Sequence, residues 1–341
     1  MTIKAGWVAA ALAAALVFSM LLSTVVGPMS LPMFDSLLAV IDGVLGSELS
    51  ALSQFQQVVV TELRLPRVLL AIAVGGILAQ CGAVIQGLFR NPLADPGIIG
   101  VSSGAAVGAI VAIVVFPAAW GLWTLPVSAF VGGLATTFLV YRLAQSQGGT
   151  SILILLLAGV AISALAGSII GFLSYFADDQ SLRSLSVWQM GALTAADPAN
   201  ITLAFVTLAL LTFAFMRHAQ ALNALLLGEA EARHLGIDVE RLKRRLVVLA
   251  AIGVGVAVSC TGIIGFVGLV VPHLVRLTLG PNHHYLLPLS ALLGALLLVL
   301  SDLLARVLVQ PAELPVGLVT VLIGAPFFLV LLLQQRKQWR P

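Results

Sequence analysis

The stretch RNPLADPGIIGVSSGAA, residues 90–106, combines two prolines and an aspartate with a run of small and apolar residues. Because proline lacks a backbone N–H and ends helices, Pro92 and Pro96 predict a tight irregular segment. This segment joins two apolar runs of membrane length. Lipid cannot satisfy an irregular backbone, so we expect the loop to be buried in protein or to line a cavity.

The composition is that of an integral membrane protein. The 341 residues are 60% hydrophobic and 9% charged, whereas soluble domains are about 45–50% apolar and about 25% charged. The alternating pattern of a membrane β-barrel is not seen. Apolar runs of about 20 residues, the length that spans a bilayer, lie at 5–26, 66–86, 98–116, 121–143, 152–174, 200–216, 246–262, 264–280, 285–303 and 315–334.

These runs predict an all-α, polytopic membrane helix bundle with ten transmembrane helices, in which residues 1–341 form a single transmembrane domain. Glycine-rich sequence leaves the helix boundaries near 246–280 open. The first run follows Lys4 and lacks a small-x-small cleavage site, so we expect a retained helix rather than a signal peptide.

The basic residues predict the orientation. With ten spans and a cytoplasmic N-terminus, all but four of the 17 lysines and arginines fall on one side of the membrane. The four exceptions are Arg64, Arg67, Arg183 and Arg306. Loops rich in Lys and Arg stay in the cytoplasm, so both termini are expected there. The net charge of +3 then reflects topology, and nucleic acid is not an expected partner.

Several kinds of chemistry are disfavoured. No predicted span has Asp, Glu, Lys or Arg near its middle, which argues against an ion-coupled secondary transporter or a channel with charged rings. None of the three lysines, Lys4, Lys243 and Lys337, belongs to a phosphate-binding glycine-rich loop, and no His-Glu-x-x-His pattern occurs. We therefore predict no catalytic residue, no metal site and no cofactor.

The inner loop 217–245 concentrates charge, and Gly228 and Gly236 bracket a short helix between Leu227 and Leu235. It is either a solvated connector or a docking surface for a soluble partner.

A second pattern is a faint repeat. RLPR at 64–67 precedes a helix that starts outside, and RLKR at 241–244 precedes one that starts inside. Inverted repeats of this kind are common in transporters, so the sequence predicts one here.

Several segments resemble the FecCD-type permeases of type II ABC importers, which move haem, iron-siderophores and vitamin B12. The resemblance extends in order over nearly the whole chain. Besides residues 90–106, it lies in segments 64–67, 156–161, 188–191, 227–237, 262–276, 312–317 and 324–328.

The resemblance implies site residues. Arg64, Arg67 and Arg306 would dock a periplasmic substrate-binding protein, with snorkelling to the membrane surface as the alternative. A cytoplasmic coupling helix would contact the ATP-binding cassette subunit through Leu227, Gly228, Glu229, Glu231, Arg233, Leu235 and Gly236. The cytoplasmic gate would be formed by Asn91, Leu93, Thr150 and Ser151, for which a turn or core role remains open.

The resemblance also implies a function. The chain would be a permease subunit in the bacterial inner membrane, in contact with lipid, that performs no bond chemistry because a separate subunit hydrolyses ATP. A second permease copy would complete the pathway, a homodimer being favoured over pairing with a sister chain. Residues 95–104 are most similar to haem permeases, while ferric siderophore and vitamin B12 remain open as substrates.

Overall fold

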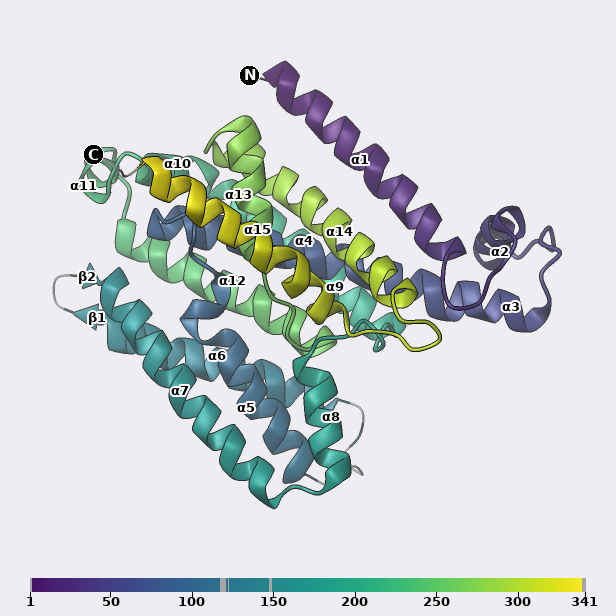
Figure 1. Cartoon of the computed structure of the whole chain (residues 1–341). Helices are drawn as coiled ribbons and strands as arrows, with labels where there is room; N and C mark the ends of the chain where they lie inside the picture. The colour runs from purple at the N-terminus through teal and green to yellow at the C-terminus, as the bar shows by residue number, and fades with distance from the viewer. Residues whose placement is uncertain (1, 117–120, 122, 147–148, 339–341) are drawn as a thin grey trace.

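The computed structural model describes residues 2–116, 121, 123–146 and 149–338, and these are almost entirely helical (Figure 1). Arg340, one of the basic residues used to predict the orientation, lies outside the described residues. The elements are α1 (Thr2–Val25), α2 (Met33–Leu45), α3 (Gln54–Val58), the π-helix η1 (Val59–Arg64), α4 (Leu65–Phe89), the 3-10 helix η2 (Pro96–Ile99), α5 (Val101–Val114), α6 (Thr124–Ala144), β1 (Gln145–Ser146), β2 (Gly149–Thr150), α7 (Ile152–Phe176), α8 (Asp179–Gln189), α9 (Pro198–Arg217), α10 (Ala219–Leu225), α11 (Glu229–His234), α12 (Val239–Thr261), α13 (Val267–Leu279), α14 (His283–Val307) and α15 (Val316–Gln338).

Seven helical segments within the described ranges are long and apolar enough to cross a membrane. They contain α1, α4, α6, α7, α9, α12 and α14. Three shorter apolar segments, Val101–Val114, Val267–Leu279 and Val316–Leu331, fall in the remaining predicted spans. The predicted all-α membrane bundle is confirmed, and the number of ten crossing helices stays a prediction.

The helices α5 and α13 are shorter than the spans predicted at 98–116 and 264–280. Gly100 before α5 has φ 85°, and Phe266 before α13 has φ 67°. A residue in the left-handed region cannot continue a right-handed helix, so each helix starts after it. The hydropathy of the sequence hides these starts because the residues on both sides are apolar.

The loop between α4 and α5 is irregular, as its prolines predict, and it is buried in part: Arg90 and Asn91 are exposed. Ala94, Pro96 and Ile99 are buried, and the Asp95 carboxylate accepts a hydrogen bond from the Gly97 N–H at 2.7 Å. This bond caps η2 and replaces contacts that lipid cannot supply.

The helix α4 forms the centre of the bundle and packs against α9, α12, α13 and α14. Glycines allow this close approach. A Cβ added at Gly75 would lie 2.3 Å from the Gly294 carbonyl oxygen, and one at Gly82 would lie 1.9 Å from that of Gly268. Helices α1 and α7 remain largely exposed.

The two ends of the bundle differ (Figure 1). The short helices α2, α3 and α8 lie at one end. The start of α1, the end of α15, the helices α10 and α11 and the hairpin of β1 and β2 lie at the other. In this hairpin Gln145 pairs with Thr150 in antiparallel register. The sequence did not predict it, because two-residue strands give no periodic signal. The predicted repeat segments at the starts of α4 and α12 lie at opposite ends (Figure 1), while the repeat itself stays a prediction.

Candidate functional site

Five charged residues form a cluster at the end of the bundle that carries α2 and α3, and we call it the arginine cluster: Arg64, Arg67, Asp302, Arg306 and Glu313. At its centre, Arg67 Nε donates to Asp302 Oδ1 at 2.6 Å and Nη1 donates to Glu313 Oε2 at 2.5 Å. Arg306 Nε lies 3.1 Å from the second Asp302 oxygen, Oδ2. The structure therefore brings the three predicted docking arginines together.

Two of these arginines also hold the end of α1. Arg64 Nη1 donates to the Thr24 carbonyl at 3.1 Å, and Arg306 Nη1 donates to the Ser23 carbonyl at 3.1 Å. The last carbonyls of a helix have no partner within the helix and favour a cation. Arg64 and Arg306 are only 5% and 2% exposed. They are thus buried in the fold rather than extended outward, and their role in docking stays a prediction.

The arginine cluster still has an opening. Four members of the cluster, all except Asp302, line a cavity of about 180 Å³. The rest of the lining is Pro28, Met29, Val59 and Leu63. Three arginines against two carboxylates leave one positive charge in excess. Since buried charges require counter-charges, the cavity suits an additional carboxylate from another molecule.

The opposite end carries the predicted coupling helix, which is α11. Gly228 before it has φ 132° and Gly236 after it has φ 82°, so both glycines adopt conformations that other residues avoid. Leu227 and Leu235 are 66% and 63% exposed, and Arg233 is exposed beside them. Two exposed leucines among charged side chains make this helix suitable for contact with another protein.

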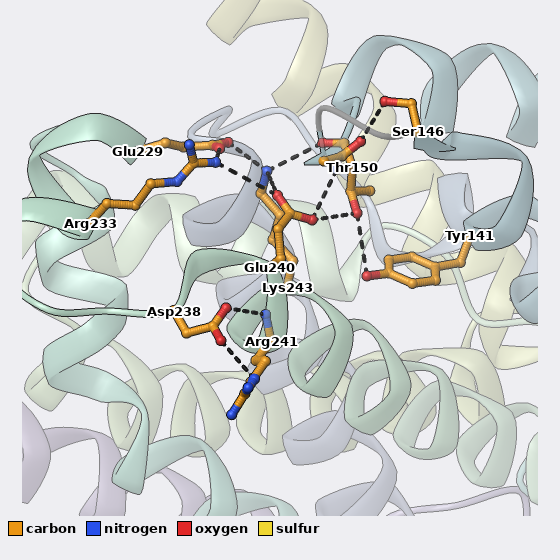
Figure 2. A network of polar contacts seen from close by, with 10 residues as sticks. Tyr141, Ser146, Thr150, Glu229, Arg233, Asp238, Glu240, Arg241 and Lys243 are labelled. Atoms are coloured by element: carbon orange, nitrogen blue, oxygen red, sulfur yellow. Dashed lines mark hydrogen bonds and ion pairs between the residues drawn. The ribbon is translucent and has the colours of Figure 1, made fainter.

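A second polar group links α11 to the hairpin, and we call it the Lys243 cluster: Thr150, Glu229, Glu240 and Lys243 (Figure 2). Lys243 lies in the first turns of α12 and is 4% exposed. Its Nζ lies 2.8 Å from Glu229 Oε1 and 3.3 Å from Glu240 Oε1. The same ammonium donates to the Thr150 carbonyl at 3.3 Å. One buried cation therefore bonds to α11, α12 and β2.

Thr150 is held by further bonds. Its N–H and its hydroxyl both donate to Glu240 Oε2, at 2.9 and 2.8 Å. Its Oγ1 lies 3.4 Å from the hydroxyl oxygen of Tyr141. The next residue, Ser151, caps α7 by accepting from the Ile154 N–H at 3.4 Å. Thr150 in β2 thus bonds to α12, and the residue after it caps α7.

The other predicted gate residues form a separate turn. The Asn91 side-chain oxygen accepts from the Leu93 N–H at 2.9 Å, and the Asn91 carbonyl accepts from the Ala94 N–H at 3.1 Å. In the part of the chain that the structure describes, no hydrogen bond joins this turn to Thr150 or Ser151. The four gate residues therefore belong to two separate hydrogen-bonded groups.

The sequence did not assign Asp302, Glu313, Glu240 or Lys243 to either cluster. The burial of Lys243 could have been predicted, because it lies in the apolar stripe that α12 buries at positions 239, 242, 243, 246 and 247. A lysine inside such a stripe needs a counter-charge nearby. Among the described residues, no group of three or more His, Cys, Asp or Glu is placed to hold a metal ion.

The described residues thus form an all-α bundle that includes helices of membrane length, with a charged cluster near each end. A profile of the FecCD transport family matches residues 15–334, and the chain belongs to this family. It is 49% identical to the hemin transport system permease protein HmuU of Yersinia pestis, over 81% of this chain and 83% of HmuU. It is 43% identical to the vitamin B12 import system permease protein BtuC of Vibrio cholerae, over 84% of this chain and 86% of BtuC.

A solved structure supports the same family. It is described as an inward-facing conformation of a metal-chelate type ABC transporter. Its chain superposes with a TM-score of 0.82 at 35% identity, and the match covers 96% of this chain and 99% of that one. The membership is therefore supported by both sequence and fold.

Proposed function

We propose that this chain is the permease subunit of an ATP-driven importer that passes haem from a periplasmic binding protein to the cytoplasm. The observation that carries the proposal is the 49% identity to a hemin permease over 81% of the chain. Vitamin B12 is the second candidate, because permeases named for it are 40–46% identical to this chain. Ferric siderophore is the third, from the resemblance of the sequence motifs.

The exposed face of α11 supports docking of a separate ATP-binding cassette subunit. Leu227 and Leu235 supply apolar contacts, while Glu231 and Arg233 supply charged ones at the rim. Such a mixture is typical of protein interfaces. The chain has no phosphate-binding loop of its own, so ATP hydrolysis is assigned to that partner.

The excess positive charge of the arginine cluster supports docking of the binding protein at the other end. A carboxylate of that protein would enter the cavity beside Arg67 and balance the charge. Glu313 already bonds to Arg67 and is exposed. It would therefore compete with an incoming carboxylate for the same guanidinium.

The exposed apolar faces support the remaining assignments. Phe172, Tyr175 and Phe176 on α7 are more than half exposed, which fits contact with lipid or with a second copy in a homodimer. The excess of basic residues on the α11 side supports a bacterial inner-membrane protein with both termini in the cytoplasm. We assign Asn91, Leu93, Thr150 and Ser151 to the cytoplasmic gate at that end.

The substrate is tested by uptake into proteoliposomes that contain the permease and its ATP-binding cassette subunit. A candidate binding protein is added with haem, vitamin B12 or a ferric siderophore. We expect ATP-dependent uptake of haem alone. Uptake of only one of the other two would reassign the substrate within the family, and no uptake of any would overturn the import proposal.

Docking is tested by the affinity of the permease for the haem-loaded binding protein. Arg67→Gln is expected to weaken binding and Glu313→Gln to strengthen it, because the competing carboxylate is removed. A misfolded variant cannot produce that gain. Arg183→Gln is the control, because Arg183 is exposed on α8 and lies outside the cluster. Unchanged or weaker binding with Glu313→Gln would refute docking at this cavity.

A further inference from the structure

The buried ammonium of Lys243 joins three elements that are distant in sequence. Glu229 on α11 provides its shortest contact, at 2.8 Å. Glu240 provides one from the first turn of α12, and the Thr150 carbonyl provides one from β2. Since a buried ammonium without partners is strongly destabilising, it has to keep a carboxylate in contact. Glu229 on α11 supplies the shorter of its two ion pairs, so a movement of α11 changes the environment of Lys243.

Thr150 depends in turn on α12. Its N–H, hydroxyl and carbonyl all bond to Glu240 or Lys243 (Figure 2). A threonine held through both backbone groups and its side chain follows any movement of those two residues. Because Thr150 directly precedes the N-cap of α7, such a movement also reaches the start of that helix.

The charges make the linkage sensitive to α11. Arg233 on α11 lies 3.7 Å from Glu229 and 4.0 Å from Glu240. Two carboxylates and two cations thus balance while α11 keeps its place. A displacement of α11 takes Glu229 away, and Lys243 is left to Glu240 and the Thr150 carbonyl. Glu240 and the Thr150 carbonyl, the two groups that link Lys243 to Thr150, then carry the whole charge of the ammonium.

We infer that Lys243 and Glu240 are positioning residues that transmit displacement of the coupling helix α11 to the gate residue Thr150. This inference rests on the proposed function, in which α11 contacts the ATP-binding cassette subunit and Thr150 belongs to the gate. Lys243 and Glu240 lie outside the coupling helix, and they would link movement of the ATP-binding cassette subunit to the cytoplasmic gate.

The first test uses the chain alone and needs neither haem nor a partner. Hydrogen exchange of the Thr150 amide is measured in detergent for the natural chain and for Glu229→Gln and Lys243→Met. We expect exchange about five- to tenfold faster in both variants, although among the described residues Glu229 contacts Lys243 and makes no hydrogen bond to Thr150. Unchanged exchange at Thr150 in Glu229→Gln would overturn the inference.

Arg241→Met is the matched control. Arg241 lies in the same turn of α12 and pairs with Asp238 at 2.7 Å, but both side chains are more than half exposed. The dashed lines in Figure 2 join Arg241 to Asp238 and not to the Lys243 cluster. We expect no change at Thr150 in this variant, and a change equal to that of Lys243→Met would count against a specific linkage.

The second test measures the transport that the linkage serves. Haem uptake per ATP hydrolysed is compared in proteoliposomes for the natural importer, Lys243→Met and Arg241→Met. We expect the ratio to fall about tenfold in Lys243→Met alone, whereas simple loss of folded permease lowers uptake and hydrolysis together. An unchanged ratio would overturn the role in transport.

The two tests separate the inference from the proposed function. If the natural importer moves no haem while Glu229→Gln still accelerates exchange at Thr150, the linkage stands and the substrate proposal fails. If haem uptake is normal but exchange at Thr150 does not respond to Glu229→Gln, the proposed function stands and the linkage is wrong.

Discussion

Arg67 and Asp302 lie 235 positions apart in sequence, yet their side chains form an ion pair of 2.6 Å between α4 and α14. The same carboxylate faces Arg306, one turn further along α14. Asp302 is thus the shared counter-charge of the buried Arg306 and the largely buried Arg67. Those arginines, with Arg64, connect the centre of the bundle to the end of α1.

Asp302→Asn should destabilise the fold strongly, because it leaves the buried Arg306 guanidinium without its carboxylate and removes one of the two carboxylates that pair with Arg67. Breaking a buried pair costs about 3–5 kcal/mol. Unfolding in detergent, followed by tryptophan fluorescence, measures the loss. Asp238→Asn is the control, since Asp238 pairs with an exposed Arg241 and Asn caps a helix as well as Asp. Equal losses in the two variants would show that burial of Asp302 does not matter.

Gly82→Val should prevent α4 from packing against α13. The added Cβ would lie 1.9 Å from the Gly268 carbonyl oxygen, so one backbone has to move. Overpacking of a tight core costs about 1–3 kcal/mol and sometimes more. The yield of monodisperse protein and its unfolding midpoint are measured. Gly6→Ala on α1, where a Cβ meets nothing within 4 Å, should change neither, and a normal midpoint for Gly82→Val would contradict the packing.

Much of the membrane fold could be predicted from the sequence because long apolar runs have few alternatives to a helix in lipid. The residues at which α5 and α13 begin could not be predicted, since Gly100 and Phe266 differ from their neighbours in backbone conformation rather than in hydropathy.

The site residues were predicted unevenly for a similar reason. Sequence motifs identified the three arginines, which line one cavity in the structure, and the short helix α11, which the structure forms at the predicted place. Their partners Asp302, Glu240 and Lys243 come from other helices, and only the tertiary arrangement brings them into contact. Thr150 was assigned to the gate by resemblance, but its attachment to α12 has no local sequence signal.

Replacing Leu227 and Leu235 together by Ser should separate the permease from its ATP-binding cassette subunit while the fold remains intact. Both leucines are largely exposed, so the permease alone loses little. Burial of a leucine in an interface is worth about 1.5–3 kcal/mol, so we expect affinity to fall roughly a hundredfold or more. Copurification with the partner measures it. Leu308→Ser, an exposed leucine at the end of α14, should bind normally, and normal binding by the double variant would refute contact through α11.

Acidification should loosen the loop between α2 and α3. The Asp42 carboxylate accepts hydrogen bonds from the Leu49 N–H at 2.9 Å and the Ser50 N–H at 2.8 Å. The backbone bond from Leu49, followed by the hydroxyl bond from Ser47, holds the pKa of Asp42 below its ordinary value. A carboxyl with a lowered pKa in the folded state stabilises the loop at neutral pH, and this contribution is lost as the pH falls through that pKa.

Hydrogen-exchange protection of the Leu49 and Ser50 amides, corrected for the intrinsic pH dependence of exchange, should therefore decrease between neutral and acidic pH. In Asp42→Asn the same amides face a side chain that does not titrate, so their protection should be low at neutral pH and should not change with pH. Protection that falls equally in both proteins would show that another group controls the loop. Protection that stays high in the natural chain at acidic pH would show that the carboxylate does not hold it.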